Sequence, residues 1–307
     1  MISRHLLTLL DLGADGLRSV LRRAHELKSL RGKEEHPRSL AHKSVVILLE
    51  KASTRTRVSF EVGIHELGGH PVVLEAKDIQ LHRGETIEDT AQVLSRYVHA
   101  IIYRTHGHER AEALAKSASV PIINGLSDTY HPCQILADLM TVEETVARPL
   151  SELKVVWIGD GNNIAHSWIN ASALLGFELV LATPAAYAPD PRVLSRATAM
   201  PPCRVHLTED VASAVRGADV VSTDVWTSMG QESEKQQRHA VFAPYTVTES
   251  MMRKAKRDAI FLHCLPAHRG EEVDAAVIDG AASRVWQEAE NRLHVQKALL
   301  ERLLADP

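Results

Sequence analysis

Short apolar runs alternate along the chain with longer stretches in which apolar residues return every three or four positions. A short apolar run predicts a buried strand, and the longer spacing predicts an amphipathic helix. Strands and helices that alternate in this way are typical of parallel sheets with helices on both faces. We expect strands at 44–49, 71–74, 100–103 and 120–124 in the first half, and at 154–158, 178–181, 204–207, 220–223 and 259–263 in the second.

The chain length of 307 residues favours two domains, because a single hydrophobic core rarely serves so long a chain. The polar stretch 143–152 contains Arg148-Pro149 and separates the two sets of expected strands. The sequence therefore predicts an α/β protein with a first domain over residues 1–147 and a second domain that starts at residue 148.

A run rich in hydroxyls and arginines follows the first expected strand. It lies where the apolar pattern changes to a helix marked by Phe60, Ile64 and Leu67. A helix N-terminus presents unpaired N–H groups and a partial positive charge, so it binds phosphate well, and arginine adds two-pronged contacts to phosphate oxygens. The simpler alternative is a capped helix with solvated arginines. The run consists of Ser53, Thr54, Arg55, Thr56 and Arg57.

The run His131-Pro132-Cys133-Gln134 lies at a second junction between a strand and a helix. Pro132 suits the first helical position, and the apolar residues that follow recur at helical spacing. His131 and Gln134 are three residues apart, so both can face one site, where their N–H groups would stabilise negative charge on a carbonyl oxygen. A capping or core histidine is the alternative interpretation.

Composition and charge exclude several classes of partner. Apolar residues make up 45% and charged residues 24% of the chain, and the formal net charge is -4. These values are ordinary for a soluble protein and give no electrostatic reason to expect nucleic acid or a membrane as a partner. The N-terminus lacks the long apolar core of a signal peptide, and no apolar stretch approaches the roughly 18 residues of a membrane-spanning helix.

The cysteines and glycines carry two further expectations. Cys133, Cys203 and Cys264 have no CxxC spacing, so we expect neither a disulfide framework nor a metal site, and the expected location is the reducing cytoplasm. Gly159 and Gly161 start a G-x-G-x-x-G pattern, but its third glycine is missing. NAD is therefore not expected, and we expect no other cofactor.

The two motif runs in this order, followed by His263-Cys264-Leu265-Pro266, resemble the aspartate/ornithine carbamoyltransferase family over nearly the whole chain. The run 224–230, Asp-Val-Trp-Thr-Ser-Met-Gly, resembles the signature of the members that use ornithine as the acceptor. The resemblance implies an enzyme that makes L-citrulline and phosphate from carbamoyl phosphate and L-ornithine. It implies a homotrimer, or a multiple of trimers, with shared active sites, and a last helix over 288–307 that packs back on the first domain, leaving 148–287 as the ornithine-binding domain. Arginine biosynthesis is the expected setting, although arginine breakdown uses the same chemistry.

The resemblance also assigns individual contacts. The implied carbamoyl phosphate contacts are Ser53, Thr54, Arg55, Thr56, Gln80, Arg104, His131, Gln134 and Arg292. The implied ornithine contacts are Asn163, Asp224, Ser228, Met229, Cys264 and Leu265. The residues expected to take part in catalysis are Arg55, Arg104, His131, Asp224 and Cys264. Gln80 differs from the rest, because the resemblance implies that its loop reaches into the active site of a neighbouring subunit.

The expected mechanism follows from charge. The δ-amine of ornithine, with a reference pKa of about 10.4 if it behaves like lysine, must lose its proton before it attacks the carbonyl carbon. We expect Asp224 and Cys264 to orient the amine and the departing phosphate to accept the proton in the end. Arg104, His131 and Thr56 would stabilise the tetrahedral oxyanion, and no covalent enzyme intermediate is needed.

Two other functions remain open at this point. A sibling carbamoyltransferase would use aspartate, putrescine or an acylated ornithine, and a non-catalytic sensor would bind the same phosphorylated ligand. The Ser-Met-Gly run at 228–230 separates the ornithine-using members from most siblings. The retained catalytic residues argue against a sensor.

Overall fold

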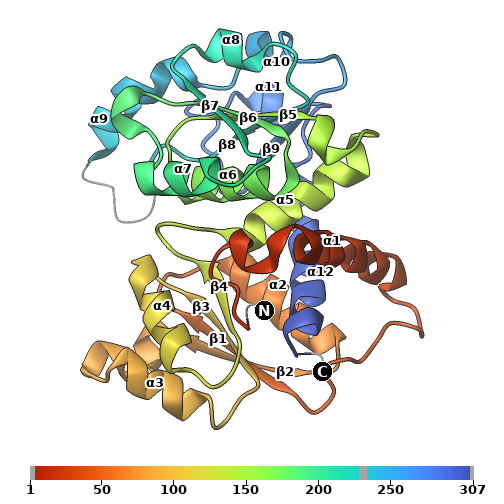
Figure 1. Ribbon diagram of the computed structural model, residues 1–307, viewed down its shortest axis with the longest axis vertical. Coiled ribbons are helices and arrows are strands. Elements are labelled where there is room, and N and C mark those ends of the chain that lie inside the picture. The colour runs from red at the N-terminus through yellow and green to blue at the C-terminus, as the bar shows by residue number, and fades with distance from the viewer. Residues whose placement is uncertain (1–3, 228–233, 305–307) are drawn as a thin grey trace. The chain divides into compact units, whose positions relative to one another are not determined.

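The computed structural model describes residues 4–227 and 234–304. It divides the chain into two compact units, one formed by Met1–Met140 with Glu290–Pro307 and the other by Thr141–Ala289. Each unit contains one parallel sheet flanked by helices (Figure 1). The predicted α/β class with two parallel sheets is confirmed.

The sheet of the first unit has four parallel strands in the order β2-β1-β3-β4. Its strands are β1 (Ser44–Leu49), β2 (His70–Glu75), β3 (Ala100–Arg104) and β4 (Ile122–Leu126). The helices that begin in this unit are α1 (Gly13–Leu30), α2 (Thr54–Glu66), α3 (Ile87–Leu94), α4 (His108–Ser117) and α5 (Pro132–Thr145). The strand order reverses between β1 and β3, so the loops that follow these two strands diverge at the carboxyl edge of the sheet.

Both faces of this sheet are buried. Val46 and Leu48 of β1 join the core cluster that contains Leu114 of α4. Val45 and Ile47 are equally inaccessible, and because successive strand residues point to opposite faces, they pack under the other helical layer. A strand covered on both faces has no polar face, which explains why the run 44–49 is apolar throughout.

The sheet of the second unit has five parallel strands in the order β7-β6-β5-β8-β9. Its strands are β5 (Lys154–Ile158), β6 (Glu178–Ala182), β7 (Arg204–Thr208), β8 (Val220–Thr223) and β9 (Ile260–His263). The helices are α6 (Asn163–Leu175), α7 (Pro191–Thr198), α8 (Val211–Val215), α9 (Lys235–Phe242), α10 (Glu249–Met252) and α11 (Ala275–Ile278). Helices α6 and α7 cover one face, and α8 and α11 lie on the other (Figure 1). Here the strand order reverses between β5 and β8.

The last helix, α12 (Val285–Leu304), starts in the second unit and continues into the first. There it lies beside α1 and α2 (Figure 1). Nε of Arg23 contacts Oε2 of Glu301 at 2.6 Å, and Nζ of the fully buried Lys297 contacts Oε2 of Glu66 at 2.6 Å. A Cβ placed on Gly63 would lie 3.3 Å from Cδ1 of Leu293, so α2 and α12 pack closely. The predicted return of the last helix to the first domain is confirmed.

Among the described residues, no helix is both long and apolar enough to span a membrane. All three cysteines are free thiols. Burial raises the pKa of the Cys133 thiol to about 12, so this thiol is protonated at neutral pH and is not an activated nucleophile.

Candidate active site

The first candidate group is built around the N-terminus of α2. Ser53 is the N-cap of this helix, and its Oγ accepts a hydrogen bond from the N–H of Thr56 at 3.2 Å. The Ser53 and Thr56 hydroxyl oxygens lie 3.1 Å apart. The cap engages the third N–H of the helix, and the N–H groups before it belong to the first turn, which has no intrahelical acceptors. This geometry is suited to an anion.

Two buried arginines from distant parts of the chain converge on Thr56. Arg104 is the last residue of β3, and its Nη1 lies 3.5 Å from Oγ1 of Thr56. Arg292 lies on α12, and its Nη2 lies 3.4 Å from the same oxygen. These distances are long for hydrogen bonds. The two guanidinium groups therefore lie around the Thr56 hydroxyl but bind it only weakly.

His131 lies among the arginines, directly before α5. Its side chain is buried, and its pKa is well below the usual value, first because of burial and then because of the positive charges of Arg292, Arg104 and Arg55. His131 is therefore neutral at neutral pH and can donate one N–H without adding charge. The arrangement brings Arg55, Arg104, His131 and Arg292 near one another.

Gln134 is held beside the arginines by two side-chain contacts. Its Oε1 accepts a hydrogen bond from Nη1 of Arg292, and its Nε2 donates to Oδ1 of Asp138 at 2.8 Å. All three side chains are buried. Gln134 therefore orients the guanidinium of Arg292 and connects it to Asp138.

The remaining predicted residues of this unit lie at the surface. Thr54 and Gln80 are exposed, Gln80 within the short 3-10 helix η3 (Gln80–Arg83). Arg57 turns away from the helix N-terminus, and its Nη1 contacts Oε1 of Glu75 at 2.7 Å. The hydroxyl and arginine run thus separates into Arg55, whose charge acts on His131, and Arg57, which forms a surface ion pair.

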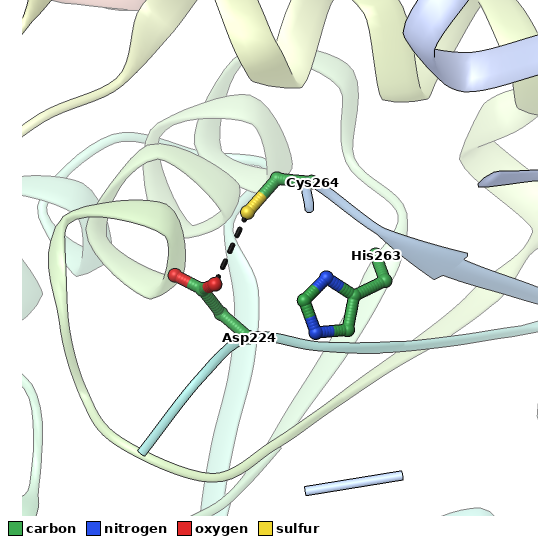
Figure 2. A group of neighbouring side chains, drawn as sticks. All are labelled: Asp224, His263 and Cys264. Carbon is green, nitrogen blue, oxygen red and sulfur yellow. Dashed lines mark hydrogen bonds between the residues drawn. The ribbon is translucent and has the colours of Figure 1, made fainter. Parts of the chain in front are cut away.

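The second candidate group lies at the carboxyl ends of β5, β8 and β9, which are neighbours in the sheet. Asp224 follows β8 and Cys264 follows β9, and the Cys264 thiol donates to Oδ1 of Asp224 at 3.2 Å (Figure 2). Nδ2 of Asn162, which follows β5, donates to Oδ2 of Asp224 at 3.2 Å. Side chains from three strand ends therefore hold one carboxylate at the point where the strand order reverses.

A second carboxylate lies near Asp224. The pKa of Asp160 is raised to about 6: burial is the largest cause and the negative charge of Asp224 acts in the same direction, while Arg238 lowers the pKa. Nη2 of the buried Arg238 pairs with Asp160, and its Nε donates to the carbonyl oxygen of Trp226. Arg238 therefore connects Trp226, two residues after Asp224, to Asp160 in the loop that follows β5.

Ligand atoms of Asp224, His263 and Cys264 lie within 4.8 Å of one another, a separation that would suit a metal ion. His263 is already engaged, however. Its Nδ1 accepts from the Leu265 N–H at 2.9 Å, and its Nε2 lies 3.1 Å from Oε1 of Glu272. A metal would have to displace one of these contacts. A second group, His268 with Glu271 and Glu272, lies partly at the surface.

The structure describes two of the other predicted ornithine contacts, Asn163 and Leu265. Asn163 is the first residue of α6, and its carbonyl oxygen accepts from Oγ of Ser167 at 2.8 Å. Leu265 has a φ of 59°, a left-handed conformation that is uncommon for leucine. Ser228 and Met229 lie outside the described residues.

Sequence reasoning missed the residues that support Asp224. Asn162 is the N-cap of α6, and its Oδ1 accepts from the N–H groups of Ile164 and Ala165. The signal was present, since an asparagine at a strand-to-helix junction is a typical cap whose other amide atom is free to face a site. The partnership of Asp160 with Arg238, 78 positions apart, had no sequence signal of this kind.

The two groups suit different ligands. Three guanidinium groups, a neutral histidine and a helix N-terminus favour a small polyanion with a polarisable oxygen. Two neighbouring carboxylates and a thiol favour an amine. The first group lies in the first unit and the second in the second unit.

Two family models together match most of the chain. The model described as "Aspartate/ornithine carbamoyltransferase, carbamoyl-P binding domain" matches residues 4–144. The model described as "Aspartate/ornithine carbamoyltransferase, Asp/Orn binding domain" matches residues 151–303.

Curated relatives and solved structures agree with this match. The chain is 52% identical over 301 residues to an ornithine carbamoyltransferase of Halorhodospira halophila, covering 98% of this chain and 99% of the relative. It is 53% identical over 300 residues to one of Nitrosococcus oceani, covering 98% and 97%. The ornithine carbamoyltransferase of Pyrococcus furiosus superposes with a TM-score of 0.92 at 50% identity, covering 96% of this chain and 95% of that one. The anabolic ornithine carbamoyltransferase of Campylobacter jejuni has a TM-score of 0.92 at 39% identity, covering 97% and 98%.

Proposed function

The chain belongs to the aspartate/ornithine carbamoyltransferase family, and we propose that it transfers the carbamoyl group of carbamoyl phosphate to the δ-amine of L-ornithine, giving L-citrulline and phosphate. The convergence of Arg55, Arg104 and Arg292 on His131 at the N-terminus of α2 carries the carbamoyl phosphate half of this proposal. Identity of about half of all positions with curated ornithine carbamoyltransferases, over nearly the full chain, supports ornithine as the acceptor.

Carbamoyl phosphate has a phosphate and a carbonyl, and the first group offers a partner for each. The first-turn N–H groups of α2, the hydroxyls of Ser53 and Thr54 and the guanidinium of Arg55 bind the phosphate oxygens. Arg104 and Arg292 lie beside the Thr56 hydroxyl and meet the bridging and carbonyl oxygens. Gln134 contributes through its contact with Arg292.

His131 polarises the carbonyl oxygen as a neutral donor. Its low pKa keeps the ring uncharged, so the ring carries one N–H and adds no fourth positive charge to the site. When the amine attacks, negative charge grows on this oxygen. His131, Arg104 and the Thr56 hydroxyl are fixed before the reaction, so they stabilise the oxyanion without reorganising.

Asp224 and Cys264 hold the attacking amine. The carboxylate first binds the ammonium form and favours its charge, so Asp224 alone cannot produce the neutral amine. Loss of the proton therefore depends on desolvation of the bound amine and on a base, and the departing phosphate is the final acceptor. Attack, collapse and release of phosphate follow with no covalent enzyme intermediate.

We propose further that residues 1–147 with 288–307 form the carbamoyl phosphate-binding domain and that 148–287 form the ornithine-binding domain. Asn163, Ser228, Met229 and Leu265 are the remaining proposed ornithine contacts. The enzyme would act in the cytoplasm as a homotrimer or a multiple of trimers, with Gln80 completing the site of a neighbouring subunit. Arginine biosynthesis is the proposed setting, supported by the similarity to the anabolic ornithine carbamoyltransferase of Campylobacter jejuni.

A panel of acceptors tests the proposal. Carbamoyl phosphate is supplied with L-ornithine, L-aspartate, putrescine or N-acetyl-L-ornithine, and both phosphate release and the carbamoylated product are measured. We expect stoichiometric citrulline and phosphate with ornithine only. Preference for another amine would keep the carbamoyl phosphate half of the proposal and overturn the acceptor half. Binding of carbamoyl phosphate without turnover of any amine would indicate a sensor.

A further inference from the structure

His263 closes β9 and immediately precedes Cys264, yet the chemistry proposed above gives it no task. Its side chain is fully inaccessible. Nδ1 accepts the Leu265 N–H at 2.9 Å, so this nitrogen bears no proton. The proton must then be on Nε2, which donates to Oε1 of Glu272 at 3.1 Å. Both ring nitrogens are thus committed, and the ring serves neither as an acid nor as a base toward a substrate.

Glu272 is the other half of this arrangement. Its side chain is also fully inaccessible, and Oε1 accepts a second hydrogen bond, from the N–H of His268 at 2.6 Å. One carboxylate oxygen of Glu272 therefore forms hydrogen bonds with both ends of the segment 263–268. A second buried carboxylate, Glu288, accepts the backbone N–H of His263 at 2.9 Å and holds the end of β9 in place.

The segment held in this way has an unfavourable backbone at its centre. Leu265 has a φ of 59°, where the Cβ of an ordinary residue is crowded, so its conformation must be imposed by the surroundings. The hydrogen bond from its N–H to Nδ1 of His263 helps to hold this conformation. The preceding residue, Cys264, donates its thiol to Asp224, so the backbone at 264–265 also sets the position of the amine-binding carboxylate.

We propose that His263 and Glu272 are positioning residues that hold the 264–265 backbone, and through Cys264 the Asp224 carboxylate, in the conformation that binds the amine acceptor. The pair touches no substrate and acts through the Leu265 N–H. The proposal rests on the proposed function, since it assumes that Asp224 and Cys264 bind the acceptor.

Two substitutions of His263 separate its two hydrogen bonds. In His263→Asn the amide oxygen lies where Nδ1 was, so the acceptor for Leu265 is kept and the donor to Glu272 is lost. In His263→Gln the amide nitrogen reaches the position of Nε2, so the donor to Glu272 is kept and the acceptor for Leu265 is lost. The pair is matched in chemistry and differs in which contact survives. His206→Asn, at an exposed position on β7 of the same unit, controls for loss of a histidine.

Steady-state citrulline formation is measured while each substrate is varied in turn. We expect His263→Gln to raise the KM for ornithine about tenfold, the equivalent of one lost hydrogen bond to a buried group, with little change in kcat. His263→Asn should raise it less than about threefold. The KM for carbamoyl phosphate should stay within about twofold in both variants, because its proposed contacts lie in the other unit. Glu272→Gln keeps the accepting oxygen and should resemble the wild type.

Several results would contradict the proposed positioning role of His263 and Glu272. An ornithine KM in His263→Gln equal to that of the wild type would show that the Leu265 contact does not position the acceptor site. Equal increases in both KM values, or failure of both His263 variants to fold in thermal melts, would make the ring a core residue only. A wild type that does not carbamoylate ornithine would instead refute the proposed function itself, so the two failures are distinguishable.

Discussion

Arg55 and Arg57 are alike in the sequence but different in the structure. The charge of Arg55 acts on the buried His131, whereas Arg57 pairs with Glu75 at the surface. The residue types of the site could be predicted, because phosphate and carbonyl chemistry requires arginine, histidine and hydroxyl groups at strand ends. The direction in which each side chain points could not, since it depends on partners such as Glu75 and Asp138 that are brought close only by folding.

This difference yields a matched pair of variants. Arg55→Ala should weaken the binding of carbamoyl phosphate by about 2 kcal/mol, roughly 30-fold, because a charged contact to the phosphate is lost. Arg57→Ala, two positions along the same helix, should change the affinity for carbamoyl phosphate by less than about twofold, because an exposed ion pair contributes little free energy. Isothermal titration with carbamoyl phosphate measures both. Equal losses in the two variants would refute the assignment of Arg55.

His131 predicts a pH dependence of stability. Its pKa is about 6.5 in the unfolded chain and well below that in the fold. Between these values the unfolded state binds the extra proton, so the free energy of unfolding rises with pH and falls as the pH drops below 6.5. From about pH 7 to about pH 5.5 the wild type should lose about 1 kcal/mol more than His131→Asn, in which this group no longer titrates. Urea unfolding of both proteins tests this, and identical pH dependences would contradict a neutral buried His131.

At the level of elements, the strands of the structure agree closely with the apolar runs in the sequence. Six of the nine predicted runs begin at the first residue of a strand in the structure, and they include β1, β5 and β8. The fourth was displaced, because β4 begins after Pro121 and continues through Gly125 to Leu126. A proline and a glycine are weak strand residues by themselves, and here pairing with β3 determines the limits.

The contact between α2 and α12 is the element-level feature that places Arg292. A Cβ on Gly63 would lie 3.2 Å from Cγ of Lys297 and 3.3 Å from Cδ1 of Leu293. Gly63→Val should therefore push the two helices apart and cost about 1–3 kcal/mol of stability, with a weaker affinity for carbamoyl phosphate because Arg292 moves with α12.

Gly16→Val is the control for this substitution. Gly16 is also a helical glycine, in α1, but the atom nearest its added Cβ is the flexible end of Arg302. Thermal melts and carbamoyl phosphate binding are compared for the two variants. A Gly63→Val protein as stable as Gly16→Val, with wild-type affinity, would show that this helix contact does not position Arg292.

At the level of the whole molecule, alternating elements and length indicated two units, and the structure divides the chain near the middle of α5. The polar stretch 143–152 could not reveal this, because α5 continues to Thr145 with an unbroken helical pattern. Composition also gives no information on assembly, which depends on surfaces that lie far apart in the sequence.

The proposed sharing of active sites between subunits predicts complementation between inactive variants. Gln80 lies on an exposed 3-10 helix, and its proposed target is the site of another copy, whereas Arg55 is proposed to act in the site of its own chain. Gln80→Ala and Arg55→Ala should each be impaired, and a mixture that has been dissociated and reassembled should regain activity, because some sites then receive both intact residues. Light scattering reports the assembly. A monomer, or a mixture no more active than its parts, would contradict shared sites.

We propose direct transfer of the carbamoyl group to the δ-nitrogen of ornithine. Carbamoyl phosphate labelled with ¹³C in the carbonyl, supplied with L-ornithine and followed by ¹³C and ³¹P NMR, tests it most directly. We expect the label only in the ureido carbon of citrulline and one phosphate released for each citrulline. Enzyme without ornithine should release no phosphate beyond the uncatalysed rate. Phosphate released without ornithine, or label found on any other acceptor or on the protein, would contradict direct transfer to ornithine.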